Sequence, residues 1–247
     1  MELVKKRGFS AEAIGKALLL RHGRQRFLVV SDFHLGFEES LNDRGALINR
    51  FQFPEIRDEL LKVIETAGTP DAVVIAGDLK HDFGRISGQE WKESLELIDF
   101  LSEHSKRLII VRGNHDTRLG KIANLRSIQI SDYLRIGRIL ILHGHKLPEL
   151  EAMRGANTII MGHEHPAIPI SDGIRTELFK CFLIGRVGRF EVIVLPSFSS
   201  TSEGTDVSSS NFMSPILKGV DIKRFRAVVC GPGLSNYEFG SISHLVP

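Results

Sequence analysis

The sequence predicts an α/β fold in which two β-sheets pack together and helices flank them. Five short apolar runs, rich in β-branched residues, lie at 27–30, 72–76, 108–111, 139–142 and 158–161. They lack polar alternation, which is typical of strands buried on both faces. Helix-like stretches separate the first three runs, and this order favours βαβ units in a mixed sheet. After Pro166 the pattern changes to that of a hairpin, which indicates a second sheet.

Two longer stretches and one short one are expected to be helical. Within residues 89–104, apolar side chains from Trp91 to Leu101 recur at spacings of three and four, as on a helix with one buried face. Residues 46–67 form the other long helical stretch. A short helix is expected over residues 11–16.

Two hairpins are predicted from apolar segments that flank polar turns. The first joins residues 17–20 to the strand at 27–30, and the second joins residues 179–184 to residues 190–195. A last strand is expected at residues 225–230.

Residues 197–215 are dominated by Ser, Thr, Gly, Asp and Asn. Few apolar residues compensate the entropy of ordering them, so we expect a mobile loop that serves as a spacer. The alternative is a lid over the substrate.

The composition is close to the average of soluble globular proteins, which argues against a disordered or fibrous class. With 247 residues, 42% hydrophobic and 25% charged, the chain fits one domain over residues 1–247. The net charge of +2 neither indicates nor excludes binding along nucleic acid. Cys181 and Cys230 lie far apart in sequence, which favours a reducing compartment. Residues 1–10 do not resemble a signal peptide and no apolar run approaches ~20 residues, so we expect a cytoplasmic protein without a membrane span.

Polar clusters follow the apolar runs at the points where the predicted strands end. The clusters are Ser31-Asp32-Phe33-His34, Gly77-Asp78-Leu79-Lys80, Gly113-Asn114-His115-Asp116, His143-Gly144 and Gly162-His163-Glu164-His165. Ligands of α/β sheets gather outside the carboxyl ends of the strands, where loops from several strands converge. We therefore expect these clusters to meet at one rim.

The side chains of these clusters suit divalent cations. Carboxylate, amide oxygen and imidazole ligands together fit Mn²⁺, Fe, Zn²⁺ or Mg²⁺, and the lack of thiolates argues against a structural zinc or iron–sulfur site. Each cluster alone is compatible with ordinary turn or capping chemistry. Their joint occurrence at successive strand ends favours a catalytic metal centre, in which Asp78 is the candidate bridge between two cations.

The ordered motifs DxH, GD, GNHD, HG and GHxH resemble those of the calcineurin-like metallophosphoesterase superfamily, and the whole chain resembles its archaeal SbcD-related phosphoesterases. The resemblance covers residues 27–199 at the level of motifs. It implies a four-layer α/β/β/α sandwich of two mixed sheets flanked by helices. It also implies a two-metal centre.

The resemblance assigns a role to each motif residue. It implies that one cation is bound by Asp32, His34, Asp78 and His165, and the other by Asp78, Asn114, His143 and His163. His115 is implied to be a catalytic histidine beside the scissile phosphate, oriented by Asp116. Asn114 and His115 are implied to contact substrate, with His81, Arg112 and His145 as further candidates. A solvated side chain is expected for Lys80.

The predicted activity is hydrolysis of phosphodiesters, with monoesters as a second class, by a hydroxide activated by two divalent metals. Manganese is favoured, with Fe, Zn²⁺, Mg²⁺ and Ni²⁺ as alternatives. The expected partner is a phosphoester derived from a nucleotide or nucleic acid, and a homodimer is left open. The alternatives are an SbcD-like DNA nuclease and a non-catalytic binding scaffold of the same fold.

Overall fold

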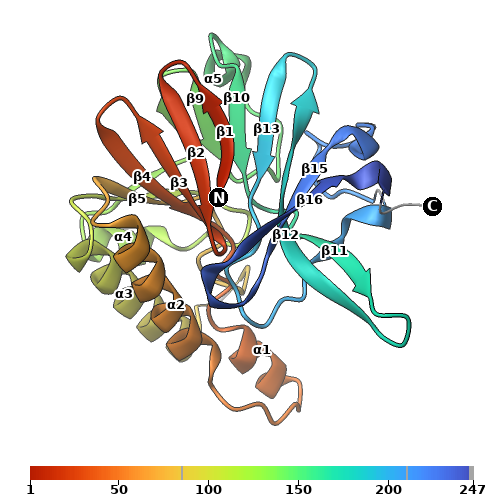
Figure 1. Ribbon diagram of the computed structural model, residues 1–247. Helices are drawn as coiled ribbons and strands as arrows, with labels where there is room; N and C mark the ends of the chain where they lie inside the picture. Colours follow the sequence, from red (N-terminus) through yellow and green to blue (C-terminus); the bar gives the residue numbers. More distant parts are fainter. Residues whose placement is uncertain (85, 210, 245–247) are drawn as a thin grey trace.

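The computed structural model describes residues 1–84, 86–209 and 211–244. Two sheets stand face to face, and three helices run along the outside of the first (Figure 1). The strands of the first sheet are β1 Glu2–Lys6, β2 Phe9–Ile14, β3 Ala17–His22, β4 Gln25–Val30, β5 Ala72–Ile75, β6 Leu108–Val111 and β7 Gln129–Ser131. They lie in sequence order. Strands β1 to β4 are antiparallel, and β4 to β7 are parallel.

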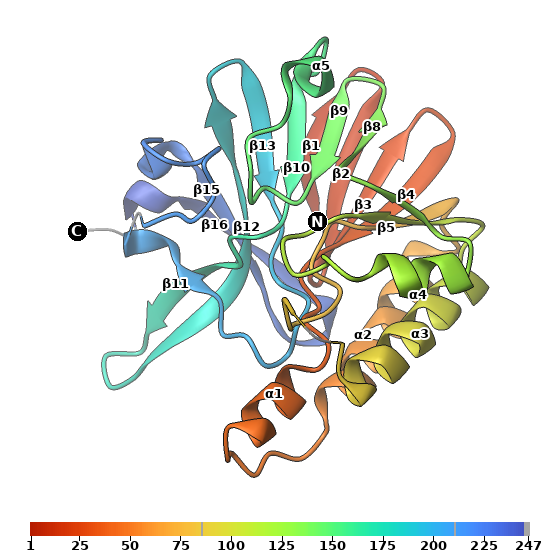
Figure 2. The ribbon, with the colours of Figure 1, turned by 180° about the vertical axis from the view of Figure 1, so that it is seen from behind.

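Helices make the connections that the parallel strands require. These helices are α1 Phe37–Asp43, α2 Gln52–Ala67, α3 Gly88–Glu103 and α4 Gly120–Leu125. Seen from behind, α2, α3 and α4 lie side by side, and α1 stands apart from them below (Figure 2). Helix α3 begins with a capping box, in which Ser87 accepts a hydrogen bond from Glu90 and the Glu90 side chain accepts one from Ser87.

The second sheet contains the later strands. They are β8 Tyr133–Ile136, β9 Ile139–Leu142, β10 Thr158–Met161, β11 Pro166–Ser171, β12 Thr176–Val187, β13 Phe190–Val194, β14 Thr205–Asp206, β15 Arg226–Cys230 and β16 Asn236–Ser241. Strands β9, β10 and β13 are parallel neighbours. Helix α5 Leu150–Met153 and the short 3₁₀ helices η1 Val207–Ser209, η2 Ile222–Arg224, η3 Pro232–Leu234 and η4 Ile242–His244 complete the elements.

Alternate side chains of the central strands enter different core layers. Leu28 and Val30 pack toward the helices with Leu60 of α2, whereas Val29 packs toward the second sheet with Ile141. The outer face of the second sheet is covered by α5 and by residues between 207 and 225. Both faces of the central strands are therefore buried, which explains why their sequences are continuously apolar.

Several expectations from the sequence were wrong. Residues 11–16 do not form a helix, because residues 9–14 pair as strand β2 with both β1 and β3. The helix expected from residue 46 begins only at Gln52, and helix α1 was not predicted. Strand β15 is not the last strand, because β16 pairs with it.

The polar segment at residues 197–215 holds more structure than its composition indicates. It contains β14 and η1 and buries the side chains of Val207 and Phe212 in the core. Residue 210 lies outside the described residues. No helix in the described part of the chain is both long and apolar enough to cross a membrane.

Candidate metal centre

The predicted ligands lie on loops that leave the carboxyl ends of strands in both sheets. Strands β4, β5 and β6 of the first sheet are parallel, and so are β9 and β10 of the second. The loops after these strands contact one another across the two sheets. The backbone N–H of His163, after β10, donates to the carboxylate of Asp32, after β4, at 3.1 Å. Residues of separate strands and separate sheets thus share one site.

Asp32, His34 and His165 form the first group. One potential ligand atom from each lies within 4.8 Å of the others. The Nε2 atom of His165 is 3.2 Å from the Asp32 Oδ1 atom and 3.2 Å from the Nε2 atom of His34. These three lone-pair donors thus lie close enough together to bind the same cation.

Asp78, His143 and His163 form the second group, again within 4.8 Å of one another. The Nε2 atom of His143 is 3.2 Å from the Asp78 Oδ2 atom and 2.9 Å from the Asn114 Oδ1 atom. The same Asp78 oxygen is 3.9 Å from the Nε2 atom of His34 in the first group. The structure therefore brings all seven predicted ligands together, with the carboxylate of Asp78 between the two groups.

Five of these seven residues have left-handed backbone conformations. The φ angles are 59° for Asp32, 49° for His34, 53° for Asp78, 73° for His163 and 47° for His165. Positive φ is uncommon outside glycine, and such residues cluster at functional sites because the surrounding structure must compensate the strain. Backbone hydrogen bonds from Asp32 to Gly77 and from His34 to Asp78 help to hold the loops.

The glycines of the motifs allow the loops to approach closely. A Cβ atom at Gly77 would overlap the ring of His143, and one at Gly113 would overlap Asp78. At Gly162 it would overlap the hydroxyl of Ser31 and lie 2.5 Å from the Asp32 carboxylate. Each of the three glycines directly precedes a predicted ligand and fits against a residue of another loop, where a side chain would not fit.

The protonation states of the site suit cation binding. Burial lowers the pKa of His34 to about 3 and that of His163 to about 4, which leaves both imidazoles neutral at pH 7. Burial alone would raise the pKa values of Asp32 and Asp78, but nearby histidines outweigh it and lower both. For His143, burial is outweighed by Asp78 and Asp32, which raise its pKa to about 9. Ionised carboxylates beside neutral imidazoles fit divalent cations, and binding would release the His143 proton.

Asp116 was expected to orient the ring of His115, but its carboxylate does not contact that ring. Its buried carboxylate accepts hydrogen bonds from the backbone N–H groups of Gly113, Asp78 and Leu79. Burial and the nearby Asp78 raise its pKa to about 6. The Nδ1 atom of His115 instead contacts the carbonyl oxygen of His81. Asp116 therefore joins the loops after β5 and β6, and the backbone of His81 orients the His115 ring.

The three further candidates for substrate contact lie in different places. His81 joins His34 and His115 in a third group of potential ligands and, with them, lines a cavity of about 280 Å³. Burial lowers the pKa of His81 to about 4. His145 lines a neighbouring cavity of about 250 Å³, and its ring centroid is 6.2 Å from that of His163. Arg112 is exposed and pairs with Asp132 at 3.8 Å.

Some residues at the site were missed or misjudged from the sequence. The ring of Phe83 lies 3.7 Å from the ring of His115, centroid to centroid, and is 54% exposed. The hydroxyl of Ser202, in the polar segment at residues 197–215, lies 3.4 Å from the Nδ1 atom of His165. Neither belongs to a strand-end motif. Lys80 is fully buried rather than solvated, and its ammonium group donates to the carbonyl oxygen of Asp82.

Comparison with known proteins gives a family and a fold. Residues 25–159 match the family described as calcineurin-like phosphoesterase. Among solved structures, the chain is similar to the nuclease MPE of Pseudomonas putida, with a TM-score of 0.65, 17% identity, and coverage of 97% of this chain and 100% of that one. It is also similar to Yfce, a phosphoesterase from E. coli, with a TM-score of 0.43, 19% identity, and coverage of 82% and 90%. No curated protein matches the chain.

Proposed function

Because the chain belongs to the calcineurin-like phosphoesterase family, we propose that it hydrolyses phosphodiester bonds at a centre of two divalent cations, with monoesters as a second substrate class. The observation that carries this proposal is the position of the Asp78 carboxylate. It faces His143 in one group of potential ligands and His34 in the other. A carboxylate in that position suits a shared ligand of two cations.

The donor set fits two cations without thiolates. Asp32, His34, Asp78 and His165 would hold one, and Asp78, Asn114, His143 and His163 the other. When bound, the cations would lower the pKa of water and neutralise charge on the phosphate. Manganese is our proposed metal, because oxygen and imidazole ligands suit it, with Fe, Zn²⁺, Mg²⁺ and Ni²⁺ as alternatives.

His115 is the proposed catalytic residue. Its Nε2 atom is 3.8 Å from the Oδ2 atom of Asp78, and its Nδ1 atom contacts the carbonyl oxygen of His81. The ring is thereby aimed at the region between the two groups. With Nδ1–H donated to that carbonyl oxygen, the Nε2 atom carries a proton only in the imidazolium form of the ring. In that form it can donate a hydrogen bond to a phosphoryl oxygen or a proton to the leaving alkoxide. Asp116 supports this geometry through the backbone, and Asn114 is a second candidate for substrate contact.

A DNA nuclease is the second candidate function. The similar structure from Pseudomonas putida is described as a nuclease. The exposed ring of Phe83 beside His115 offers a surface on which a base can stack. An SbcD-like nuclease falls within this candidate. A non-catalytic scaffold is disfavoured, because a scaffold has no need to keep seven residues of suitable chemistry in contact.

A substrate panel tests the proposal. The substrates are bis-p-nitrophenyl phosphate, p-nitrophenyl phosphate, 2′,3′-cyclic nucleotides and labelled single-stranded DNA, each assayed with Mn²⁺, Mg²⁺ and Zn²⁺. We expect metal-dependent cleavage of the diesters, and its loss in His163→Ala. Cleavage of DNA at rates above those of the small diesters would favour the nuclease. Turnover that persists in His163→Ala, or none with any metal, would refute the proposal.

A further inference from the structure

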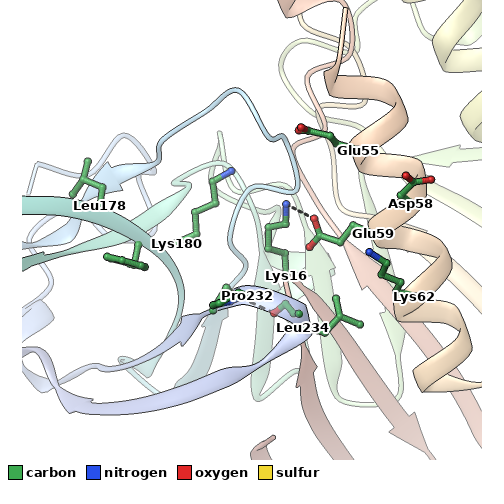
Figure 3. A pocket seen from close by; sticks show the side chains of 14 residues that line it. Lys16, Glu55, Asp58, Glu59, Lys62, Leu178, Lys180, Pro232 and Leu234 are labelled. Atoms are coloured by element: carbon green, nitrogen blue, oxygen red, sulfur yellow. Dashed lines mark hydrogen bonds and ion pairs between the residues drawn. The ribbon is translucent and has the colours of Figure 1, made fainter.

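A second pocket lies on the far side of a chain segment that supports the metal centre. Its volume is about 540 Å³, within the range of small-molecule sites, and it opens between α2, β12 and η3 (Figure 3). None of the predicted metal ligands lines it. Residues 197–199, here called the strap, separate it from Asp32. The strap holds the loop after β4 through hydrogen bonds from the backbone of Phe198 to Ser31 and from that of Ser199 to Asp32.

Two lysines of the pocket reach toward the strap (Figure 3). The ammonium group of Lys180 donates to the carbonyl oxygens of Ser197, at 3.2 Å, and Ser199. The ammonium group of Lys16 donates to the carbonyl oxygen of Phe198 at 3.1 Å. The two ammonium groups therefore line one wall of the pocket, and the strap fixes their positions.

The charges of these lysines are compensated unequally. The ammonium nitrogen of Lys16 lies 2.6 Å from a carboxylate oxygen of Glu59 and forms an ion pair with it. In the described part of the chain, Lys180 has no carboxylate within 4.0 Å of its ammonium group. Burial, followed by the charge of Lys16, lowers the pKa of Lys180 to about 7. Glu55 and Asp58 also line the pocket, but they are exposed on α2, where water screens their charges.

We propose that this pocket binds a small organic anion whose acidic group contacts Lys180. A half-buried ammonium group without a counter-ion is unfavourable, and an anion from solution supplies one. The remaining walls fit an apolar body, because they include the half-buried side chains of Leu178, Phe179 and Leu234. The ligand is therefore a phosphate or carboxylate compound with an apolar body, and the contact of its acidic group with Lys180 fixes its position.

The test measures how fast the amine of Lys180 is acetylated at pH 7 by the neutral reagent N-succinimidyl acetate, with peptide mapping by mass spectrometry. The metal-loaded enzyme is labelled alone and with phenylphosphonate, benzoate or benzyl alcohol. Phenylphosphonate has a P–C bond that a phosphoesterase does not hydrolyse. We expect a several-fold lower rate at Lys180 with a saturating anion and no change at exposed Lys218. The stronger of the two anions identifies the preferred acidic group.

Three results would overturn the proposal. The first is that neither anion slows the acetylation of Lys180, and the second is that benzyl alcohol slows it as much as the anions do. The third is that Lys180 is not acetylated in the free enzyme, which would mean that the pocket does not reach it. Calorimetry adds an independent readout. Lys180→Met should lose one phenylphosphonate-binding event that Lys180→Arg and the control Lys218→Met retain. Because neither readout measures hydrolysis, this inference and the proposed activity stand or fall separately.

Discussion

At the scale of single residues, the carboxylate of Asp78 is the point where the two ligand groups meet. It is buried and also accepts a hydrogen bond from the backbone N–H of His115 at 2.9 Å. Asp78→Asn keeps this shape but removes the charge. We expect bound metal to fall and hydrolysis to drop at least ~100-fold, since a cation contributes several kcal/mol and each 1.4 kcal/mol is tenfold in rate. Metal analysis and diesterase assays check this. The control Asp43→Asn, at an exposed carboxylate of α1, should keep both, and full metal content in Asp78→Asn would contradict the assignment.

His115 is expected to act on the substrate more than on the metals. His115→Ala should keep its metal content and lose about 10² to 10⁴-fold in kcat, the range of acid–base assistance. The matched control is His22 in the β3–β4 hairpin, and His22→Ala should leave kcat unchanged. If His115→Ala loses metal, His115 is a metal ligand instead. Its potential ligand atom lies close enough to those of His34 and His81 for that role.

Gly162 illustrates how strictly the loops are packed. Alanine there would overlap Ser31 and crowd the carboxylate of Asp32, so Gly162→Ala should displace a predicted ligand. We expect weaker metal binding and a destabilisation of about 1–3 kcal/mol, typical of overpacking. Gly120→Ala at the start of α4 is the control, because a Cβ there meets no atom within 4 Å, and its stability should stay the same or rise. Equal effects of the two substitutions, in metal titration and denaturant unfolding, would argue against this packing account.

At the scale of elements, helix α2 holds the first sheet through one apolar face. Leu60 is 0% exposed in the core, whereas its neighbour Leu61 is 38% exposed. Leu60→Ala should lower the free energy of unfolding by about 2–5 kcal/mol, because it leaves a cavity, and Leu61→Ala by about 0.5 kcal/mol or less. Urea unfolding of both variants measures the difference. Similar losses would mean that α2 does not pack through this face.

At the scale of the whole molecule, the metal centre joins the two sheets. Asp32 and Asp78 follow strands of the first sheet, and His143 and His163 follow strands of the second. Cations that bind only this folded arrangement should stabilise it by about 2.7 kcal/mol at one hundred times Kd. For a chain of this size we expect Tm to rise by about 5–10 °C with Mn²⁺ and to fall back with a chelator. Thermal unfolding of His163→Ala should show a much smaller rise, and an undiminished one would place the stabilising cation elsewhere.

Much of the architecture could be predicted because it depends on local sequence. The runs at 72–76, 108–111, 139–142 and 158–161 were confirmed as strands, since a strand buried on both faces must be apolar throughout. The helix near residues 89–104 was confirmed as α3, whose spacing and cap are also local. The expected helix over residues 11–16 was wrong because tertiary pairing with β1 and β3 overrides a weak local preference.

The sequence by itself determined which residue types stand at the strand ends, and therefore the family and the class of chemistry. Only the tertiary structure decided how those residues meet. The left-handed backbone of His163 and His165, the backbone contacts of Asp116, the burial of Lys80 and the pocket beside Lys180 all depend on neighbours far away in the chain. Short-range patterns record what a residue can do, whereas its contacts, burial and pKa depend on the loops packed against it.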